Sequence, residues 1–559
     1  MHAEATIYTV AANCQDCYRC VRICPVKAIR INGGQARVED ELCLKCGACV
    51  RECPQRAKAI SSGLEKVQAL LRSGRPVAAS VAPSFAALPD AGRLPSALRR
   101  LGFRHVSETA AGAKYITAAM LSAAAEGVCT ACPAVVSYVE KYRPEMLGVL
   151  IPIVSPMIAH ARILKARLGG GWAVVFIGPC AAKKAEAERP ENAGAVDAVL
   201  TFAELGEWLE EEDIQIENCL ESDFDQAGEI GAARLFPLPG GLLETGGLLA
   251  GGIGVAEVIH LSGADEVMAL FADSEISRRY KYAEPLFCKG GCINGPALGG
   301  EDDPLRRRAK IIAYAQTAPV PESEPRTAAP AGTFFTARED FFTAVTENQI
   351  NKALERTGKL DPASRLNCGA CGYKNCLDNA SAVARGMAEP EMCMPYMRVL
   401  AQQRTDRIIE TMPSGVMIVD GELNMIRMNP AFQKMFICGG DILGRRVSYL
   451  LDPEGFEKLL LREVELYESI QTRYGVRYHE IVYALREDNQ YIGIYSDISH
   501  VRCNREQLDV IKAQTLRHAR EFLSHQVRFA QEMADYLGKS TARSEEIARR
   551  LISLYDHSL

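Results

Sequence analysis

The stretch Cys14-Gln-Asp-Cys17-Tyr-Arg-Cys20-Val-Arg-Ile-Cys24-Pro25 recurs as Cys43-Leu-Lys-Cys46-Gly-Ala-Cys49-Val-Arg-Glu-Cys53-Pro54. Spacings of two residues bring three thiolates onto one [4Fe-4S] cubane within a tight loop, and the fourth cysteine of each run ligates the other cluster. This crossed rule predicts one cluster on Cys14, Cys17, Cys20 and Cys53, and a second on Cys43, Cys46, Cys49 and Cys24. A zinc site of four thiolates rarely repeats this spacing with a following proline, so we interpret the repeat as a pair of iron–sulfur clusters.

The composition limits the classes of protein that the chain can belong to. It has 559 residues, of which 48% are apolar, so it is too long for one domain. We expect roughly three to five domains. Its 64 basic and 70 acidic residues give a formal charge of -6, which provides no polybasic surface for nucleic acid or anionic lipid. We therefore expect no nucleic-acid binding and no membrane binding.

The 20 cysteines stand mostly in close-spaced groups. Disulfide scaffolds are typical of short secreted chains, whereas this long chain reaches Cys14 without a basic segment followed by an apolar one. No run of 18 apolar residues occurs either. This cysteine usage predicts metal ligation and a cytoplasmic location.

The pattern of elements divides the chain at a Pro-rich linker. Residues 1–62 carry the cysteine repeat and predict a ferredoxin-like fold. Residues 63–316 alternate helices with short β-type runs, which predicts an α/β domain with a largely parallel sheet. Residues 317–333 are Pro-rich, polar and without period, so we predict a semi-rigid linker there. The clearest elements of the α/β region are helices over Gly63–Leu71, Ala110–Ala125 and Ala159–Leu168, and strands over Pro76–Val81 and Trp172–Ile177.

Behind the linker the pattern changes twice. Residues 334–399 predict a small helical domain, and residues 400–500 predict a strand, short helices and three further β-runs, with Gly415–Asp420 and Tyr491–Asp497 as the clearest strands. In residues 501–559, mostly apolar side chains from Leu516 to Leu537 alternate in spacings of three and four, which predicts a helix that Gly538 ends. A second helix is predicted over Thr541–Tyr555. The fold class is thus multidomain, with α/β and α+β parts.

Five cysteines of residues 63–316 look ordinary singly, because a lone buried cysteine is most often a small apolar side chain. They are Cys129, Cys132, Cys180, Cys288 and Cys292. The contexts of four of them are Thr130-Ala-Cys132-Pro133, Gly178-Pro-Cys180-Ala-Ala-Lys183-Lys-Ala-Glu186 and Glu284-Pro-Leu-Phe-Cys288-Lys-Gly-Gly-Cys292-Ile-Asn-Gly295. In this order, the three segments resemble the signature segments of [FeFe]-hydrogenases.

The resemblance implies a catalytic H-cluster. Its [4Fe-4S] part would be held by Cys132, Cys180, Cys288 and Cys292, and Cys292 would also bridge to a [2Fe] subsite carrying CO, CN and azadithiolate. Soft thiolates suit iron–sulfur clusters, and ligands from three distant loops form a buried site. By the same resemblance Lys183 hydrogen-bonds the diiron cyanides, where a cation offsets ligand charge. A solvated helix residue is the alternative interpretation of Lys183.

Three positions depart from the family pattern. Ala131 stands where high-turnover members carry a proton-relaying cysteine, Gly178 replaces a methionine that lines the site, and Pro296 interrupts the Gly-rich end of the third segment. The missing relay predicts slow turnover, and a substitute path is expected among titratable groups near the ligand loops.

The candidates for this path are Cys129, Glu186, Glu244 and Glu284, of which Glu186 stands at the family's carboxylate position. We hypothesise that Cys129, Glu244 and Glu284 form the working path. For each of them a purely structural role is the alternative.

The segment Cys368-Gly-Ala-Cys371-Gly-Tyr-Lys-Asn-Cys376, followed by Cys393, resembles a small one-cluster [4Fe-4S] domain. Gly369 and Gly372 permit the left-handed turns that bend the chain around a cubane. A structural zinc site, the alternative, would prefer paired short knuckles. These four bring the ligand cysteines to 16 of 20. Besides Cys129, the remaining cysteines are expected in cores or partly exposed, and they are Cys219, Cys438 and Cys503.

Residues 400–500 resemble a PAS domain, on the stretches Met412–Asp420 and Asn424–Phe432 and the closing Ile498-Ser499. No heme or flavin motif stands out, so no ligand is predicted for its pocket. The 3,4 spacing of the last helix fits a dimeric coiled coil, with Gln526 at a register-setting position, or a helix packed on the PAS core. We favour the coiled coil and hence a homodimer.

The whole chain is thus interpreted as a sensory, or regulatory, [FeFe]-hydrogenase with four [4Fe-4S] clusters and a [2Fe] subsite, acting on H2 and protons. Expected partners are a ferredoxin or another redox donor or acceptor, and a downstream kinase or phosphatase. Because the sensor label depends on domain analogy, two other classes stay open. One is a non-catalytic iron–sulfur redox sensor or scaffold that lacks the diiron subsite, and the other is a metabolic ferredoxin hydrogenase with fast turnover.

Overall fold

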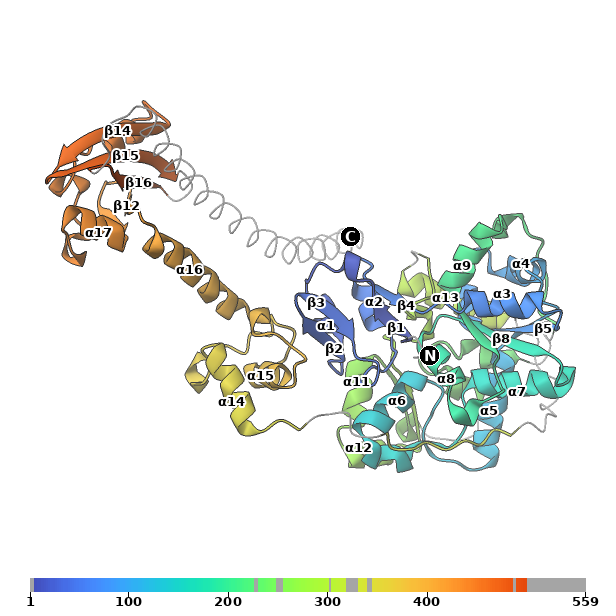
Figure 1. Ribbon diagram of the computed structural model, residues 1–559. Helices are drawn as coiled ribbons and strands as arrows, with labels where there is room; N and C mark the ends of the chain where they lie inside the picture. The colour runs from blue at the N-terminus through green and yellow to red at the C-terminus, as the bar shows by residue number, and fades with distance from the viewer. Residues whose placement is uncertain are drawn as a thin grey trace, which may run out of the picture. The chain divides into compact units, whose positions relative to one another are not determined.

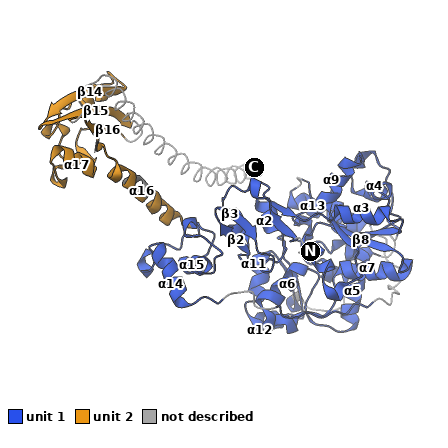
Figure 2. Ribbon diagram, viewed as in Figure 1, with its two compact units in different colours: residues 1–392 blue, residues 393–559 orange. Residues whose placement is uncertain are grey.

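A computed structural model describes residues 5–225, 230–247, 255–300, 303–317, 330–338, 344–485 and 489–499. The chain forms two compact units, residues 1–392 and 393–559 (Figure 2). Most of the predicted linker and both predicted C-terminal helices, with Cys503, lie outside the described residues. No helix in the described ranges combines the length and the apolar character needed to cross a membrane.

The N-terminal domain is built from two similar halves (Figure 1). Strand β1 (Ile7–Thr9) pairs antiparallel with β4 (Lys58–Ile60), and β2 (Ile29–Asn32) pairs antiparallel with β3 (Gln35–Val38). The short helices α1 (Arg19–Ile23) and α2 (Ala48–Glu52) follow equivalent cysteine loops. Each helix begins after a left-handed residue, Tyr18 at φ 53° or Gly47 at φ 72°, which turns the chain sharply out of the loop.

The α/β domain is centred on a four-stranded sheet in the order β6-β5-β8-β9, in which all neighbouring strands are parallel. Every residue of β5 and β8 is buried, as expected when helices cover both faces of a parallel sheet. The strands are β5 (Val77–Val81), β6 (His105–Glu108), β8 (Ala173–Gly178) and β9 (Ala198–Thr201). The largely parallel sheet predicted for this region is therefore present.

Helices lie on both sides of this sheet, with α3, α4 and α9 on one side and α5 and α7 on the other (Figure 1). The three predicted helices are α3 (Leu64–Arg72), α5 (Ala110–Ser122) and α7 (Pro156–Leu168). A capping box between Thr201 and Glu204 starts α9. The other helices of the domain are α4 (Leu94–Arg100), α6 (Pro133–Tyr142), α8 (Ala182–Ala187), α9 (Phe202–Glu211), α10 (Gly241–Thr245), α11 (Ala264–Leu270), α12 (Ser274–Arg279) and α13 (Pro304–Gln316).

A second, smaller parallel sheet has the order β10-β11-β7, with β7 (Gly127–Val128), β10 (Val258–Ser262) and β11 (Tyr282–Leu286). Strands β7 and β11 of this sheet, and β8 of the larger sheet, end just before the cysteines of the three signature segments. Ligand sites in α/β proteins lie at the carboxyl ends of parallel strands. The topology therefore brings these distant loops together.

After the α/β domain, the chain returns along its surface. Residue Gly332 bridges to Ile153, and the backbone N–H of Arg338 donates to Glu140 O at 3.0 Å. The end of the predicted linker and the start of the predicted small domain thus contact the α/β domain. Helices α14 (Glu347–Arg356) and α15 (Cys376–Ala384) follow, as expected for a helical segment.

The second unit begins with α16 (Met394–Thr411). Residues 400–411 are therefore helical, and the strand that we expected at the start of this region begins only at Gly415. Five antiparallel strands then form a sheet in the order β13-β12-β16-β15-β14. The remaining elements are β12 (Gly415–Val419), β13 (Met425–Met428), α17 (Pro430–Phe436), α18 (Glu454–Leu460), β14 (Leu466–Arg473), β15 (Val476–Leu485) and β16 (Gln490–Asp497).

The core of this sheet domain is filled by aromatic rings. Phe432 lies 5.1 Å from Tyr495, and Phe436 lies 5.1 Å from Tyr478, between ring centroids. All four side chains are buried. Asn429 caps α17 and donates to Ile409 O and Ser414 O at 2.9 Å, which ties α16 to the sheet.

Candidate functional site

The N-terminal cysteines lie in two hydrogen-bonded loops of matching geometry. The backbone N–H of Ala28 donates to Cys24 Sγ at 3.2 Å, and that of Ala57 donates to Cys53 Sγ at 3.2 Å, at equivalent places in the repeat. Such bonds favour the thiolate, which is the ligating form of cysteine. Both halves of the domain therefore hold a cysteine sulfur with an equivalent backbone hydrogen bond.

The effects of neighbouring cysteines on the pKa of each thiol indicate which cysteines lie close together. Burial, together with the neighbouring thiols of Cys24 and Cys43, raises the pKa of Cys46 to about 12. Burial also raises the pKa of Cys49, with additional contributions from Cys43, Cys46 and Cys24. Cys24 thus lies near the second run of cysteines, and its ligation to the cluster of that run stays a prediction.

The second group of thiols lies at the strand ends of the α/β domain. Cys132 follows β7 and precedes α6, Cys180 follows β8, and Cys288 and Cys292 follow β11. Pro133 occupies the first turn of α6, where a missing N–H costs nothing, and so fixes the position of Cys132. Burial, together with the nearby thiol of Cys132, raises the pKa of Cys180 to about 11.

Burial also raises the pKa of Cys288 and of Cys292, and each of these thiols is raised further by Cys132 and Cys180. Thiols gathered in a buried place repel one another as thiolates, and bound iron cations would remove that repulsion. Within the described residues, no three His, Cys, Asp or Glu side chains are close enough to hold a single metal ion. A four-iron cubane is larger than one ion, and the donor set and burial of the four thiols fit such a cubane.

A cavity of about 80 Å³ is lined in part by two of these cysteines. Its wall is mostly apolar, and its polar groups include the Ser84 hydroxyl, which is buried and has no hydrogen-bond partner in the described part of the chain. Other lining residues include Ala131, Phe176, Cys180, Lys183, Phe236 and Cys292. This cavity has room for a small group among mostly apolar side chains.

Lys183 lies at the edge of the cavity and is 9% exposed, so it is not a solvated helix residue. Its ammonium donates to Glu186 Oε2 at 2.7 Å and to Ala131 O at 3.2 Å. Glu186 is also buried and forms an ion pair with this ammonium. A cation held in this way can donate to an anionic group in the cavity.

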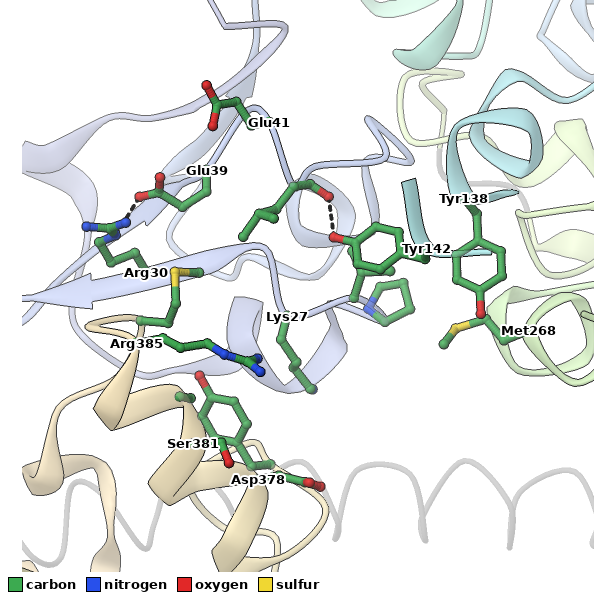
Figure 3. Close-up of a pocket in the computed structure, with 16 residues that line it drawn as sticks. Lys27, Arg30, Glu39, Glu41, Tyr138, Tyr142, Met268, Asp378, Ser381 and Arg385 are labelled. Atoms are coloured by element: carbon green, nitrogen blue, oxygen red, sulfur yellow. Dashed lines mark hydrogen bonds and ion pairs between the residues drawn. The ribbon is translucent and has the colours of Figure 1, made fainter. Parts of the chain in front are cut away.

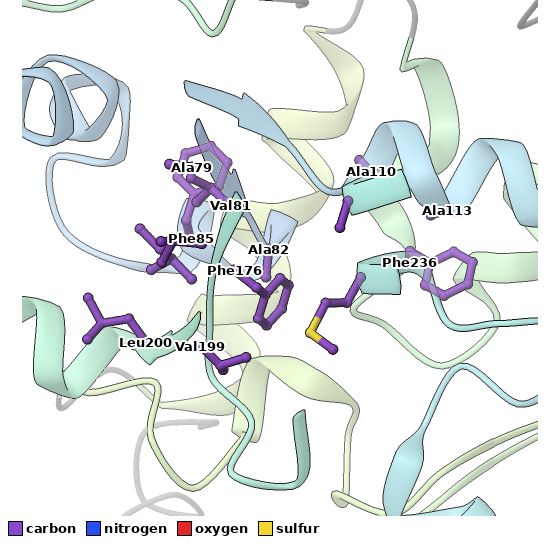
Figure 4. Close-up of a cluster of buried hydrophobic side chains, with 14 of the residues drawn as sticks. Ala79, Val81, Ala82, Phe85, Ala110, Ala113, Phe176, Val199, Leu200 and Phe236 are labelled. Atoms are coloured by element: carbon purple, nitrogen blue, oxygen red, sulfur yellow. The ribbon is translucent and has the colours of Figure 1, made fainter. Parts of the chain in front are cut away.

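Two departures from the family pattern have physical reasons. A Cβ on Gly178 would come within 2.6 Å of the Phe176 ring, which itself lines the cavity, so a side chain there is excluded. Figure 4 shows Phe176 beside Ala82 in the core. A Cβ on Gly47 would lie 2.3 Å from the Pro296 ring, so Pro296 packs against the cysteine loop of the N-terminal domain.

The three residues of the hypothesised proton path occupy different environments. Cys129 and Glu284 are buried, and the charge of Glu284 raises the pKa of Cys129 beyond the effect of burial. Glu284 Oε1 accepts from Leu242 N at 3.2 Å, whereas Oε2 has no partner among the described residues. Glu244 is exposed at the surface of α10, two residues from Leu242.

Burial raises the pKa of Glu284 from 4.5 to about 8. Cys129, Ala131 and Leu242 all line a small cavity of about 10 Å³. Ala131 also lines the larger cavity. The residues therefore form a series from the larger cavity through Cys129 and Glu284 to α10.

A buried ion pair between Arg234 and Glu108 lies near the wall of the larger cavity. Arg234 Nη2 donates to Glu108 Oε1 at 2.7 Å, Tyr314 donates to the same oxygen at 2.8 Å, and the guanidinium lies 4.0 Å from the centre of the Tyr314 ring. Arg234 stands two residues before Phe236, which lines the larger cavity together with Pro237. No sequence motif links Glu108 with Arg234, which lies 126 residues away.

The third group of cysteines lies partly in each unit. Cys368, Cys371 and Cys376 belong to the first unit, and Cys393 is the first residue of the second. Asn367 Oδ1 accepts from Cys376 N at 2.9 Å, and Gly369 and Gly372 adopt φ of 71° and 92°. The left-handed turns expected of both glycines are present. Of the remaining cysteines, Cys219 is buried and Cys438 is partly exposed.

The folds and sites therefore define an iron–sulfur protein with a hydrogenase-like centre. Four regions match family models. Residues 6–54 match the 4Fe-4S dicluster domain, and residues 75–296 match the C-terminal domain of the iron only hydrogenase large subunit. Residues 365–395 match a putative Fe-S cluster, and residues 403–468 match the PAS domain. The ferredoxin-like, H-cluster α/β and PAS folds predicted from the sequence are confirmed. The coiled coil lies outside the described residues.

The chain is similar to known proteins over part of its length. It is 27% identical over 379 residues to the NADP-reducing hydrogenase subunit HndD of Solidesulfovibrio fructosivorans, covering 55% of this chain and 60% of that protein. It is 40% identical over 78 residues to the cytosolic Fe-S cluster assembly factor NAR1 of Vanderwaltozyma polyspora, covering 14% of this chain and 15% of that protein. A solved variant of the [FeFe]-hydrogenase HydA1 from Chlamydomonas reinhardtii aligns at 17% identity and a TM-score of 0.37, over 50% of this chain and 99% of that one.

Proposed function

We propose that this protein is a hydrogen-sensing [FeFe]-hydrogenase that turns over slowly and reports the redox state of its clusters to its PAS domain. The observation that carries the proposal is one mostly apolar cavity lined by Cys180, Cys292 and Lys183 within a domain matching the iron only hydrogenase model. A structural cysteine cluster alone would not need a cation and an orphaned hydroxyl beside an apolar cavity.

The residues around the cavity fit a diiron group beside a cubane. Cys132, Cys180, Cys288 and Cys292 would hold the cubane, with Cys292 shared between the two parts. When bound, the diiron group with its CO, CN and azadithiolate ligands would supply the chemistry that interconverts H2 with protons and electrons. Lys183 would donate a hydrogen bond to a cyanide, and the apolar wall would keep water from the site.

Protons would leave by way of Cys129, Glu284 and the surface at Glu244. With a pKa of about 8, Glu284 is protonated at neutral pH and can give up or accept a proton at Oε2, the oxygen that has no partner. Glu186, by contrast, is paired with Lys183 and would hold that ammonium in place. The longer path and the absence of a thiol at Ala131 account for the slow turnover that we propose.

Replacing Glu284 with glutamine is expected to slow hydrogen oxidation by about a hundredfold, because general acid–base groups contribute about 10²- to 10⁴-fold. Glutamine keeps the size of the neutral acid and its acceptor for Leu242 N, but it cannot transfer a proton. The rate is measured with an artificial electron acceptor. Glu207→Gln, a change of an exposed carboxylate on α9, is the matched control. An unchanged rate in Glu284→Gln would exclude Glu284 from the path.

The same variant gives a pH prediction. Because the folded-state pKa of Glu284 is raised from 4.5 to about 8, its contribution to stability is present below pH 4.5 and is lost as the pH rises through 8. Between pH 5 and 9 the wild-type melting temperature should therefore fall more than that of Glu284→Gln. Parallel curves for the two proteins would contradict the raised pKa.

The signalling half of the proposal is supported by the two regions behind the linker. Residues 365–395 would hold a third cluster-binding site on Cys368, Cys371, Cys376 and Cys393, and residues 403–468 match the PAS domain. PAS domains commonly pass signals to a partner, so a kinase or phosphatase and a homodimer remain the partners that we propose. A ferredoxin or similar carrier would exchange electrons with the N-terminal clusters. The close-spaced groups of cysteines suit metal ligation, and we propose a cytoplasmic location on that basis.

A non-catalytic redox sensor or scaffold is the second candidate, favoured by the 78-residue likeness to an iron–sulfur cluster assembly factor. The two candidates differ in iron content. Four cubanes and a diiron group give 4 × 4 + 2 = 18 irons per chain, whereas four cubanes alone give 16. Iron analysis of the matured protein, with H2 as the only reductant of its clusters, tests the proposal. Sixteen irons and no reduction by H2 would favour the scaffold.

A further inference from the structure

The two halves of the N-terminal domain carry an arginine at the same place. Arg22 in α1 and Arg51 in α2 both stand two residues after the third cysteine of their run. Arg51 Nη1 donates to Asn294 O at 3.1 Å, and Arg22 Nη1 donates to Ala370 O at 3.2 Å. Asn294 lies in the loop of Cys292, and Ala370 lies between Cys368 and Cys371. Each half therefore binds a different cysteine loop with an equivalent side chain.

Further contacts hold the second half against the α/β domain. Gly47 leaves room for the Pro296 ring, and Tyr142 donates to Leu42 O at 2.7 Å. Lys141 donates to the carbonyl of the ligand candidate Cys43 at 2.9 Å. The second run of cysteines is thus fixed against the loop that carries Cys292.

The first half is held against residues 365–392 in a corresponding way. Ile31 N donates to Met387 O at 3.0 Å, and Gly33 N donates to Glu389 Oε1 at 2.6 Å. A Cβ on Gly372 would lie 3.1 Å from Val21 Cγ1 and 3.2 Å from Arg22 N, so the loop of Cys371 lies directly on α1. The buried Tyr373 ring belongs to the same apolar cluster as Val21.

The contact between the first half and residues 365–392, which we call the junction, also involves the cysteine loops themselves. Arg22 Nη2 donates to Cys17 O at 2.7 Å while Nη1 bonds to Ala370 O, so one guanidinium bridges two cysteine loops. Lys27 donates to Val21 O at 2.8 Å and lies 6.0 Å from the centre of the Tyr373 ring. Figure 3 shows Lys27 beside Asp378, Ser381 and Arg385 at a cavity of about 510 Å³.

We propose that the two halves of the N-terminal domain are an inlet and an outlet for electrons, with Arg51 positioning the inlet at the Cys292 loop and Arg22 positioning the outlet at the Cys368–Cys376 loop. This inference rests on the proposed function. Oxidation of one H2 would release two protons and two electrons, and each electron would reduce one [4Fe-4S] cluster from the 2+ to the 1+ state. The cluster behind the linker would receive its electron through the N-terminal domain, and would not receive it from the catalytic centre directly.

The test compares Arg22→Glu with Arg51→Glu in the full, matured protein. Both variants reverse the same charge at equivalent positions of exposed side chains. The protein is mixed with H2 and frozen after set times, and electron paramagnetic resonance follows the reduction of each cluster. The signal of the cluster behind the linker is identified by its loss in Cys371→Ala.

Arg22→Glu should slow reduction of the cluster behind the linker by about tenfold, a factor typical of losing one charge-assisted hydrogen bond, and leave the N-terminal clusters unaffected. Arg51→Glu should slow the reduction of all three non-catalytic clusters. Equal effects of the two variants, or no effect of Arg22→Glu, would overturn the inference. Iron analysis verifies that both variants keep their clusters.

A second measurement separates this inference from the proposed function. In protein reduced by dithionite, magnetic coupling between the N-terminal clusters and the cluster behind the linker requires no hydrogenase activity. The coupling should be lost in Arg22→Glu and kept in Arg51→Glu. If H2 does not reduce the wild-type protein, but the coupling is lost in Arg22→Glu and kept in Arg51→Glu, the proposed function fails and the inference about the junction is supported. If the coupling is the same in both variants, the junction fails.

Discussion

Replacing Cys292 with alanine is expected to reduce hydrogen oxidation by more than about a hundredfold, because removing even an outer partner of a metal ligand costs about 10- to 100-fold. Cys292 is the residue that we assign to both parts of the catalytic centre. Its side chain lines the cavity, while its backbone N–H bonds to Pro237 O at 2.7 Å and is unchanged by the substitution. The loop should therefore keep its shape while the thiol is lost.

The measurement combines hydrogen oxidation with iron content. Cys292→Ala should contain at least two fewer irons per chain than wild-type protein after identical maturation. Cys219→Ala is the matched control, because Cys219 is a buried cysteine outside all three cysteine groups. Cys292→Ala protein that keeps its activity would exclude the proposed centre.

Replacing Arg234 with alanine should destabilise the α/β domain by about 3–5 kcal/mol, the cost of leaving one charge of a buried ion pair without its partner. Glu108 is fully buried, and Arg234 is 6% exposed in its side chain. The pKa of Glu108 is raised by burial, while Arg234 and Tyr314 counteract that rise. Without the guanidinium, the carboxylate would lose its main counter-charge.

Chemical unfolding of the wild type and the variant measures this loss. Arg306→Ala is the control, because Arg306 is 77% exposed and pairs only with the neighbouring Asp303. Its effect should stay within about 0.5 kcal/mol. A loss in Arg234→Ala as small as that of the control would show that the buried pair does not hold the cavity wall.

Local patterns made much of the structure predictable. Cysteine spacing and following prolines define the N-terminal loops, because all three cysteines of a run lie within one short turn. Continuous apolar runs predicted β5 and β8, since strands buried on both faces need no polar residues. The boundary of the PAS region was less predictable. Residues 400–411 lack a strong apolar face, and their helix continues from Cys393 through backbone bonds that sequence periodicity does not record.

The residues of the site were predictable only where they belong to a local sequence motif. Cys180 and Lys183 follow from one segment, whereas the contact of Gly47 with Pro296 joins residues 249 positions apart and has no local signal. Likewise, the exposure of Glu244 and the burial of Glu284 depend on how α10 packs on β11. The hydrogen bond from Arg22 to Ala370 O depends on a contact between domains that no local sequence pattern indicates.

Infrared spectroscopy of the matured protein tests the central claim most directly, because CO and cyanide bound to iron absorb where protein does not. The account predicts CO and cyanide bands under argon and a shift in their positions when the protein is placed under H2. The absence of these bands from fully matured protein would contradict the account and leave an iron–sulfur protein without the diiron group.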